Sequence, residues 1–219
     1  MIARVWHSVI VVLVLVALLI QTHLALKASG VVPPGGDLGR LAGASPLGRI
    51  IRQFSFFTVQ SNILSAIVSA QLAMNAYRDG PGWRVLRLDA LFGITVTGLV
   101  YATVLAPVHN PRGWQEVWSN FFVHYAVPVM MVVGWIVWGP RPRITARVVG
   151  LSLIWPVGWL TYTLIRGEIW PWYPYPFLNV PDHGYATVLI NAVAVTIVFG
   201  LVAALFALGD RKLKPAPKG

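Results

Sequence analysis

One histidine lies in the middle of an apolar, aromatic run. His124 belongs to the segment NFFVHYAVPVMM, residues 120–131, which has the composition of the first half of a membrane helix. Ionisable residues inside membrane helices are costly and usually functional. A neutral imidazole can take a proton from a hydroxyl group and so activate that group as a nucleophile. His124 is therefore the first candidate for chemistry, as a general base.

A threonine in a second apolar segment offers a matching hydroxyl. Thr58 lies six residues after Arg52 in RQFSFFTVQSN, and His124 lies six residues after Trp118. If Arg52 and Trp118 mark the outer ends of their helices, both side chains lie at one depth, about 9 Å along each axis. A Thr–His pair predicts ester hydrolysis, with the Thr58 hydroxyl as nucleophile. A site in the outer leaflet would receive a lipid ester laterally.

Further polar side chains share this predicted depth. Asn62 is one helical turn from Thr58, and a stripe of serines extends the same face. Such a stripe must face the bundle interior rather than lipid, so we expect a polar cavity open toward the outer leaflet. No carboxylate is evident that could complete a triad, so we expect a neutral group to orient the imidazole. The candidates for stabilising an oxyanion or orienting the base are Asn62, Tyr101, Tyr162 and Asn191.

Each candidate also has a structural interpretation. Ser and Thr in membrane helices commonly bond to their own backbone or allow close packing, and Asn can hold helices together. Tyr101 and Tyr162 could anchor their helices at the membrane interface. His124 could make a structural hydrogen bond. Depth also does not establish that two helices are neighbours, so the pairing of Thr58 with His124 needs the tertiary structure.

An aromatic segment follows the fifth apolar stretch. Residues 167–183 read GEIWPWYPYPFLNVPDH. The prolines prevent a regular helix, and Trp and Tyr favour the membrane interface. We predict that this segment caps the cavity and contacts a lipid; the alternative is an interfacial aromatic belt. The predicted substrate-binding residues are Trp172, Tyr173, Tyr175 and Phe177.

Membrane helices must position all these residues. Hydrophobic residues make up 57% of the 219 residues and charged residues 11%, against about 25% charged in a soluble domain. Long apolar stretches without alternation favour helices over a barrel, and a span needs roughly 20 apolar residues. We predict one all-α, polytopic membrane domain over residues 1–219. Its six transmembrane helices are expected at 5–26, 52–76, 84–106, 117–138, 147–166 and 184–208.

Positive charge is spread unevenly over the predicted loops. The formal net charge is +10, and with the N-terminus inside, eleven of the seventeen Lys and Arg residues are cytoplasmic. The positive-inside rule therefore predicts a multi-pass protein with both termini in the cytoplasm, in the plasma membrane. Topology and anionic lipid explain the charge, without nucleic acid. The first segment is expected to be a retained helix rather than a cleaved signal peptide, because no small-x-small cleavage site precedes residue 28.

Three stretches together resemble a known family. They are FFTVQSNIL, HYAVPV and YTLIRGEIWPWYPYPFLNV. They resemble the androgen-induced protein family, which includes the androgen-dependent tissue factor pathway inhibitor regulating protein, and more closely its six-helix bacterial relatives. In helix count and order the resemblance covers nearly the whole chain.

The resemblance implies an activity and a catalytic pair. The animal members are multipass threonine hydrolases that cleave fatty acid esters of hydroxy fatty acids, using an essential Thr and an essential His. Matched by motif, these residues fall on Thr58 and His124. The run from Trp172 to Leu178 matches a shorter Tyr-Pro-Phe-Leu run in the animal proteins. The chain departs from them in the QSN after its Thr and in the spacing from its His to the following Pro.

Two other classes remain open. His23, His109, His124 and His183 all fall toward the outer side in this topology, with Glu168 and Asp182. Such side chains could bind zinc, in a metal-dependent membrane hydrolase or a metal transporter, although no His-x-x-x-His or His-Glu-x-x-His motif occurs. A small-molecule transporter would favour broken helices and an internal repeat, and no convincing repeat occurs. The hydrolase interpretation needs no metal or cofactor, and its partners are a lipid substrate and the bilayer.

Overall fold

The computed structural model describes residues 1–27, 41 and 43–214, and over these residues the chain forms helices and no strand. The prediction of an all-α protein is confirmed. The α-helices are α1 Ile2–Lys27, α3 Pro46–Ser55, α4 Phe57–Met74, α5 Pro81–Val100, α6 Gly113–Phe121, α7 Val127–Trp138, α8 Ala146–Ser152, α9 Ile154–Ile169 and α10 Val180–Lys212.

Most of these helices are membrane-spanning by length and composition. Five helical stretches of the described chain are long and apolar enough to cross a membrane, and there are six if the bent pair α3–α4 counts as one span. Large apolar side chains such as Leu19, Ile190 and Leu205 are about two-thirds exposed. Lipid is the solvent that favours such a surface. The chain is therefore a polytopic membrane protein.

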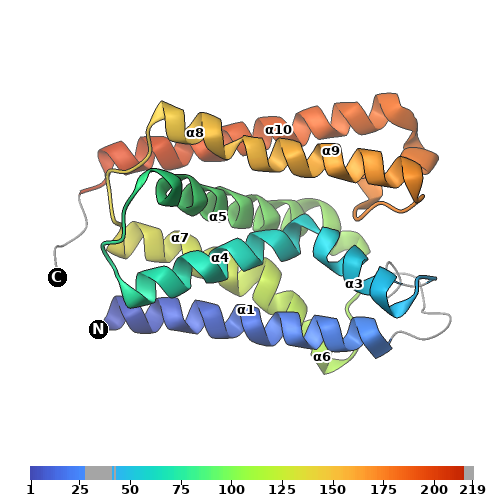
Figure 1. Ribbon diagram of the computed structural model, residues 1–219, viewed down its shortest axis with the longest axis horizontal. Coiled ribbons are helices and arrows are strands. Elements are labelled where there is room, and N and C mark those ends of the chain that lie inside the picture. Colours follow the sequence, from blue (N-terminus) through green and yellow to red (C-terminus); the bar gives the residue numbers. More distant parts are fainter. Residues whose placement is uncertain (28–40, 42, 215–219) are drawn as a thin grey trace.

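The helices form one bundle with α5 near its centre (Figure 1). Helix α5 packs against α4, α7, α8 and α10, whereas α1 packs against α4, α6 and α7. In the view of Figure 1, α1 lies along one edge and α9 and α10 lie along the other. The start of α1 and the end of α10 lie at the same end of the bundle, which we call the terminal end. An even number of spans would give this arrangement.

The second predicted span is broken. The sequence predicts one helix over 52–76, but α3 and α4 meet at an angle of 70°. Phe56 has extended backbone angles (φ −66°, ψ 131°) and separates the two helices. Its ring packs edge-on against Trp172 and Tyr175, with centroid distances of 5.6 and 5.7 Å. These long-range contacts stabilise the break, so the prediction of a continuous helix is wrong here.

Two other spans contain π-helical turns at residues singled out by the sequence. Residues Tyr101–Leu105 continue α5 as a π-helix, and Phe122–Ala126 join α6 to α7 in the same way. π-Turns are frequent at functional sites. The second one has a local cause, because Pro128 has no N–H to donate to the carbonyl of His124 in a regular α-helix.

The remaining spans differ from prediction mainly at their limits. Helices α8 and α9 replace one helix predicted over 147–166, with a break at Leu153. Helix α10 runs from Val180 to Lys212 but is kinked at Gly184, where the backbone is non-helical (φ 71°), so its long part begins near the predicted residue 184. A positive φ suits glycine because no Cβ clashes there.

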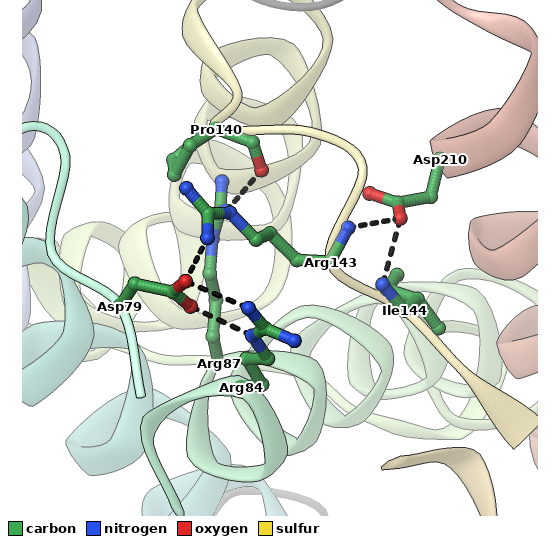
Figure 2. Close-up of polar contacts among 7 residues, drawn as sticks. All are labelled: Asp79, Arg84, Arg87, Pro140, Arg143, Ile144 and Asp210. Carbon is green, nitrogen blue, oxygen red and sulfur yellow. Dashed lines mark hydrogen bonds and ion pairs between the residues drawn. The ribbon is translucent and has the colours of Figure 1, made fainter. Parts of the chain in front are cut away.

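The terminal end is held by buried charged side chains (Figure 2). Arg87 is 5% exposed and donates to the carbonyl oxygens of Gly139 and Pro140, the latter at 2.8 Å. Asp210 is 1% exposed and accepts the backbone N–H of Ile144 at 2.7 Å. Buried charged groups need such partners to offset their desolvation. These bonds tie α5 and α10 to the α7–α8 loop.

A surface ion-pair cluster completes this end of the bundle. Asp79, in the α4–α5 loop, pairs with Arg84 at 2.7 Å and also with Arg143 (Figure 2). Partly exposed pairs of this kind contribute little stability individually. Their arrangement nevertheless gathers arginines from α5 and the α7–α8 loop at the end where α1 begins and α10 ends.

Candidate active site

The break at Phe56 places Thr58 in the first turn of α4. The first amides of a helix have no acceptor within that helix. The Thr58 N–H donates instead to the hydroxyl of Tyr175, with N···O 3.1 Å. The Thr58 Oγ1 lies 3.2 Å from the same Tyr175 oxygen. Both the amide and the hydroxyl of a buried threonine therefore converge on one point beside a helix N-terminus.

His124 is held in one orientation by a neighbour one turn earlier. Its Nδ1 lies 2.7 Å from Asn120 Oδ1. An amide oxygen only accepts, so Nδ1 carries the proton and Nε2 carries the lone pair. The imidazole also stacks on the ring of Tyr101, with centroids 3.8 Å apart and planes 16° apart. The Tyr101 hydroxyl lies 2.8 Å from His109 Nδ1. The ring of His124 is thus fixed by an amide and an aromatic face.

Thr58 and His124 line the same cavity. We call it the polar cavity; its volume is about 60 Å³. Within the described chain the Thr58 hydroxyl bonds to Tyr175 and not to the imidazole. Catalytic hydrogen bonds are often not formed until a substrate binds. The polar side chains that line it are Gln21, Gln53, Thr58, Tyr101, His109, Glu116, Ser119, His124 and Tyr175.

A second cavity adjoins the first. It lies between α4, α5, α9 and α10, has a volume of about 120 Å³, and is lined mainly by aliphatic and aromatic side chains; we call it the apolar cavity. Thr58, Leu105 and Tyr175 line both cavities. The contact between Thr58 and Tyr175 therefore lies on the wall shared by the two cavities, of which the first has more polar side chains in its lining.

Asn62 connects the two candidate catalytic residues through the backbone. Its Nδ2 donates to the carbonyl of Thr58 at 2.8 Å and to the carbonyl of Val123 at 3.2 Å. Both amide protons go to main-chain acceptors, one on α4 and one directly before His124. Asn62 does not line either cavity in the described chain. Its geometry fits a residue that fixes the spacing of α4 and the π-turn rather than an oxyanion donor.

The other predicted donors divide into one that shares a cavity with Thr58 and two that do not. Tyr101 lines the polar cavity. The Tyr162 hydroxyl lies 2.8 Å from Ser55 Oγ, and Asn191 Nδ2 donates to the carbonyl of Phe177 at 2.9 Å. Neither Tyr162 nor Asn191 belongs to the described lining of the two cavities. The Tyr162 bond links α9 to the end of α3, and the Asn191 bond links α10 to the aromatic segment.

The serines of the stripe on α4 form hydrogen bonds within the helix or to a neighbouring helix. Ser61 Oγ donates to the carbonyl of Phe57 and Ser65 Oγ to the carbonyl of Ser61, both at 2.8 Å. Ser69 Oγ contacts the sulfur of Met131. These buried hydroxyls are satisfied within or between helices. Only the first member of the predicted polar face, Thr58, reaches a cavity.

The aromatic segment divides into two parts. Tyr175 and Phe177 line the apolar cavity, and their rings stack with centroids 5.4 Å apart. The Trp172 ring instead contacts the guanidinium groups of Arg52 and Arg166, which lie 5.4 and 4.7 Å from its centroid. Such cation–π contacts hold the segment on α3 and α9.

Tyr173, like Trp172, holds the aromatic segment against a helix and does not line a described cavity. Its ring packs so closely on Gly167 that no side chain fits at that glycine. Burial, with a smaller effect from Glu168, raises the pKa of the Tyr173 phenol above its usual value. Tyr173 therefore remains neutral and packs on α9, and it lines neither cavity in the described chain.

The sequence missed two members of the site. Asn120 was detectable, because Asn-x-x-x-His places both side chains on one helix face. Glu116 lies one turn further back; it is 7% exposed, accepts the N–H of Arg112 at 2.6 Å and lines the polar cavity. The partner of the His124 imidazole is thus a neutral amide, and Glu116 adds a carboxylate to the same cavity.

Several ionisable residues besides His124 are buried in the helices. His7 on α1 and Arg87 on α5 are each 5% exposed, and Asp89 is partly buried on α5. Ionisable character inside a span does not by itself single out His124. Unlike His7, Arg87 and Asp89, His124 lines a described cavity, together with His109 and Glu116.

The described residues do not form the ligand cluster that a metal site would need. Within the residues that the structure describes, no group of three or more His, Asp or Glu side chains is placed to hold a metal ion. His109 and His124 both contact Tyr101, one through its hydroxyl and one through its ring. The two imidazoles belong to one polar cluster.

Comparisons with protein-family models, with curated proteins and with solved structures find no match for this chain. Fold and cavities define the class: a polytopic α-helical membrane protein with a broken span. A polar and an apolar cavity meet at the start of α4, opposite the terminal end.

Proposed function

We propose that this protein is an intramembrane threonine hydrolase that cleaves lipid esters. Thr58 is the nucleophile and His124 is its general base. One observation carries the proposal: the hydroxyl and amide of Thr58 lie together at the broken start of α4, on the wall of the cavity that His124 also lines. A first-turn amide with no helical acceptor is suited to hold developing negative charge.

The first half-reaction transfers the acyl group to Thr58. As Thr58 Oγ1 forms a bond to the ester carbonyl carbon, His124 Nε2 takes the hydroxyl proton and the carbonyl electron pair moves onto oxygen. The ester C–O bond then breaks, and the alcohol leaves with the proton from His124. In the second half-reaction His124 takes a proton from water, the hydroxide attacks the acyl-Thr58 ester, and Thr58 regains its proton as the fatty acid leaves.

Two groups are positioned to stabilise the oxyanion. The Tyr175 hydroxyl oxygen now accepts the Thr58 N–H. When the carbonyl oxygen of a substrate takes that place, the Thr58 N–H and the Tyr175 O–H both become donors to it. Asn120 acts through His124, because its bond to Nδ1 keeps Nε2 unprotonated and aimed consistently. Asn120 is therefore a positioning residue.

The proposed location is the plasma membrane, with both termini in the cytoplasm. The start of α1 and the end of α10 share one end of the bundle, where Arg84, Arg87 and Arg143 also gather (Figures 1 and 2). Arginine enrichment at one end favours the cytoplasmic side. The two cavities then open at the level of the outer leaflet.

A small-molecule transporter is a second candidate. The 70° break between α3 and α4 favours it, because transporter sites commonly form at discontinuous helices. A transporter needs no nucleophile. Transport in proteoliposomes that is unaffected by Thr58→Ala, without ester cleavage, would favour this candidate.

Covalent labelling tests the hydrolase directly. Purified protein is treated with a fluorophosphonate probe and assayed on a panel of lipid esters. Wild type should be labelled at Thr58, and Thr58→Ala should lose both label and turnover. Thr95→Ala is the matched control, because the Thr95 hydroxyl bonds to the Leu91 carbonyl of its own helix. Full turnover of folded Thr58→Ala would overturn the proposal.

A further inference from the structure

The two cavities differ in ways that constrain the two halves of an ester. Resting on the proposed function, we infer that the apolar cavity takes the acyl chain and that the polar cavity takes an uncharged alcohol half bearing hydroxyl groups. The substrate class is then a monoacylglycerol-like ester. The reacting bond lies at the wall between the cavities, where Thr58 and Tyr175 meet.

Two buried amide oxygens in the lining of the polar cavity have no hydrogen-bond donor in the described chain. Gln53 is 3% exposed and lines this cavity. Its Nε2 donates to Thr22 Oγ1 at 3.0 Å, whereas its Oε1 has no hydrogen-bond partner in the described chain. Gln21 lines the same cavity, and its buried Oε1 also has no hydrogen-bond partner in the described chain. Buried acceptors without partners carry a free-energy cost, which a ligand with O–H groups would remove.

The charge around the polar cavity excludes an anionic alcohol half. Glu116 lines it, and no Lys or Arg does among the residues that the structure describes. A free carboxylate or phosphate there would face Glu116 in a medium of low dielectric, with no Lys or Arg in the described lining to pair with it. Neither that anion nor a quaternary ammonium group has a proton to give to Gln21 or Gln53. A glycerol-like group has donors and no charge.

The apolar cavity fits a hydrocarbon chain. Val96, Leu160, Val195 and Phe199 line it from α5, α9 and α10. Ala192 lines it as well and is 6% exposed, so a larger side chain at this position would fill the space. Burial of each further CH₂ group adds favourable free energy. Chain length should therefore matter on this side of Thr58 only.

Substrate competition tests the alcohol half. Wild-type protein is given esters of one fatty acid with glycerol, with a hydroxy fatty acid, with choline and with a long-chain alcohol. We expect kcat/KM for the monoacylglycerol to exceed each of the others by about tenfold or more. Gln53→Leu should abolish this preference. Gln71→Leu is the matched control, because Gln71 Oε1 is also buried without a partner in the described chain but lines neither cavity there.

Chain-length selectivity tests the acyl half. Ala192→Phe should reduce kcat/KM for long-chain monoacylglycerols about tenfold relative to short-chain ones. Ala194→Phe, an exposed position on the same helix, should leave the ratio unchanged. An unchanged ratio in Ala192→Phe, with Thr58-dependent turnover intact, would overturn the assignment of the acyl chain and leave the hydrolase standing.

A binding experiment separates the inference from catalysis. A 1-O-alkylglycerol, whose ether bond cannot be hydrolysed, should bind both wild type and Thr58→Ala in calorimetric titration. Gln53→Leu and Ala192→Phe should each weaken this binding about tenfold. Binding that depends on both residues without any ester cleavage would refute the hydrolase but keep the division of the cavities. Preference for the carboxylate-bearing ester, or binding insensitive to Gln53, would refute the division itself.

Discussion

Thr58 and Tyr175 are 117 residues apart in the chain and meet at the start of α4, where the Tyr175 hydroxyl lies 3.1 Å from the Thr58 nitrogen and 3.2 Å from its Oγ1. One phenol thus covers both the amide and the hydroxyl of a residue on the wall between two cavities. The aromatic segment and the broken span therefore form a single site. The following predictions test what each part contributes.

The catalytic pair should behave as one unit. Thr58→Ala and His124→Ala are each expected to lower esterase turnover by about 10³-fold or more, and the double variant should lose little beyond either. Thr58→Ser should retain partial turnover, because it keeps a hydroxyl at the same position. Turnover is measured on protein whose folding is checked by its melting curve. Additive losses in the double variant would argue against a shared step.

Tyr175→Phe removes only the hydroxyl that bonds to Thr58. Loss of one oxyanion donor typically reduces kcat by about 10²–10³-fold, and we expect a decrease in this range with a smaller change in KM. Tyr173→Phe is the matched control, because Tyr173 packs on Gly167 and lines neither cavity in the described chain. A lower melting temperature with normal turnover per folded molecule would assign Tyr175 to stability alone.

Asn120→Ala should lower kcat by roughly 10²-fold without a comparable effect on KM, because the imidazole loses the acceptor that fixes its tautomer. Asn120→Asp keeps an acceptor toward Nδ1–H and should restore part of the loss. Steady-state kinetics on both variants make the comparison. Equal losses in Ala and Asp variants would point to packing instead of orientation.

Gly98 allows α5 to approach the turn that carries His124. A Cβ at this position would lie 3.0 Å from Pro128 Cβ and 3.3 Å from the His124 carbonyl oxygen. Gly98→Ala should therefore destabilise the fold by about 1–3 kcal/mol, as overpacking does. Gly158→Ala on α9 meets nothing within 4 Å and should be neutral or stabilising. Melting temperatures of the two variants provide the test.

Reporter fusions test the orientation. Alkaline phosphatase fused after Gly219 should be inactive and a fluorescent protein fused there should be bright, because the positive-inside rule places this end in the cytoplasm. Phosphatase inserted within the 109–112 loop between α5 and α6 should be active. The reverse pattern would place the cavities on the cytoplasmic side.

The sequence by itself determined the class of the molecule and the approximate limits of its spans. Long apolar stretches leave helices as the solution for a chain of this composition in lipid, because each helix satisfies its own backbone. The sequence placed Thr58 and His124 inside predicted spans, but not relative to the true helix ends, because α4 begins only at Phe57 and α6 already at Gly113. Asn120 was within reach through its spacing from His124.

Only the tertiary structure decided where the second span breaks and what the polar residues do. Phe56 leaves the helix because its ring packs on Trp172 and Tyr175, which hydropathy and periodicity do not encode. Tyr162 and Asn191 share a predicted depth with Thr58 but bond elsewhere. Depth along a helix says nothing about rotation around its axis or about neighbours. Those depend on side-chain packing between segments far apart in the chain, and that packing also set Thr58 on the wall between two cavities.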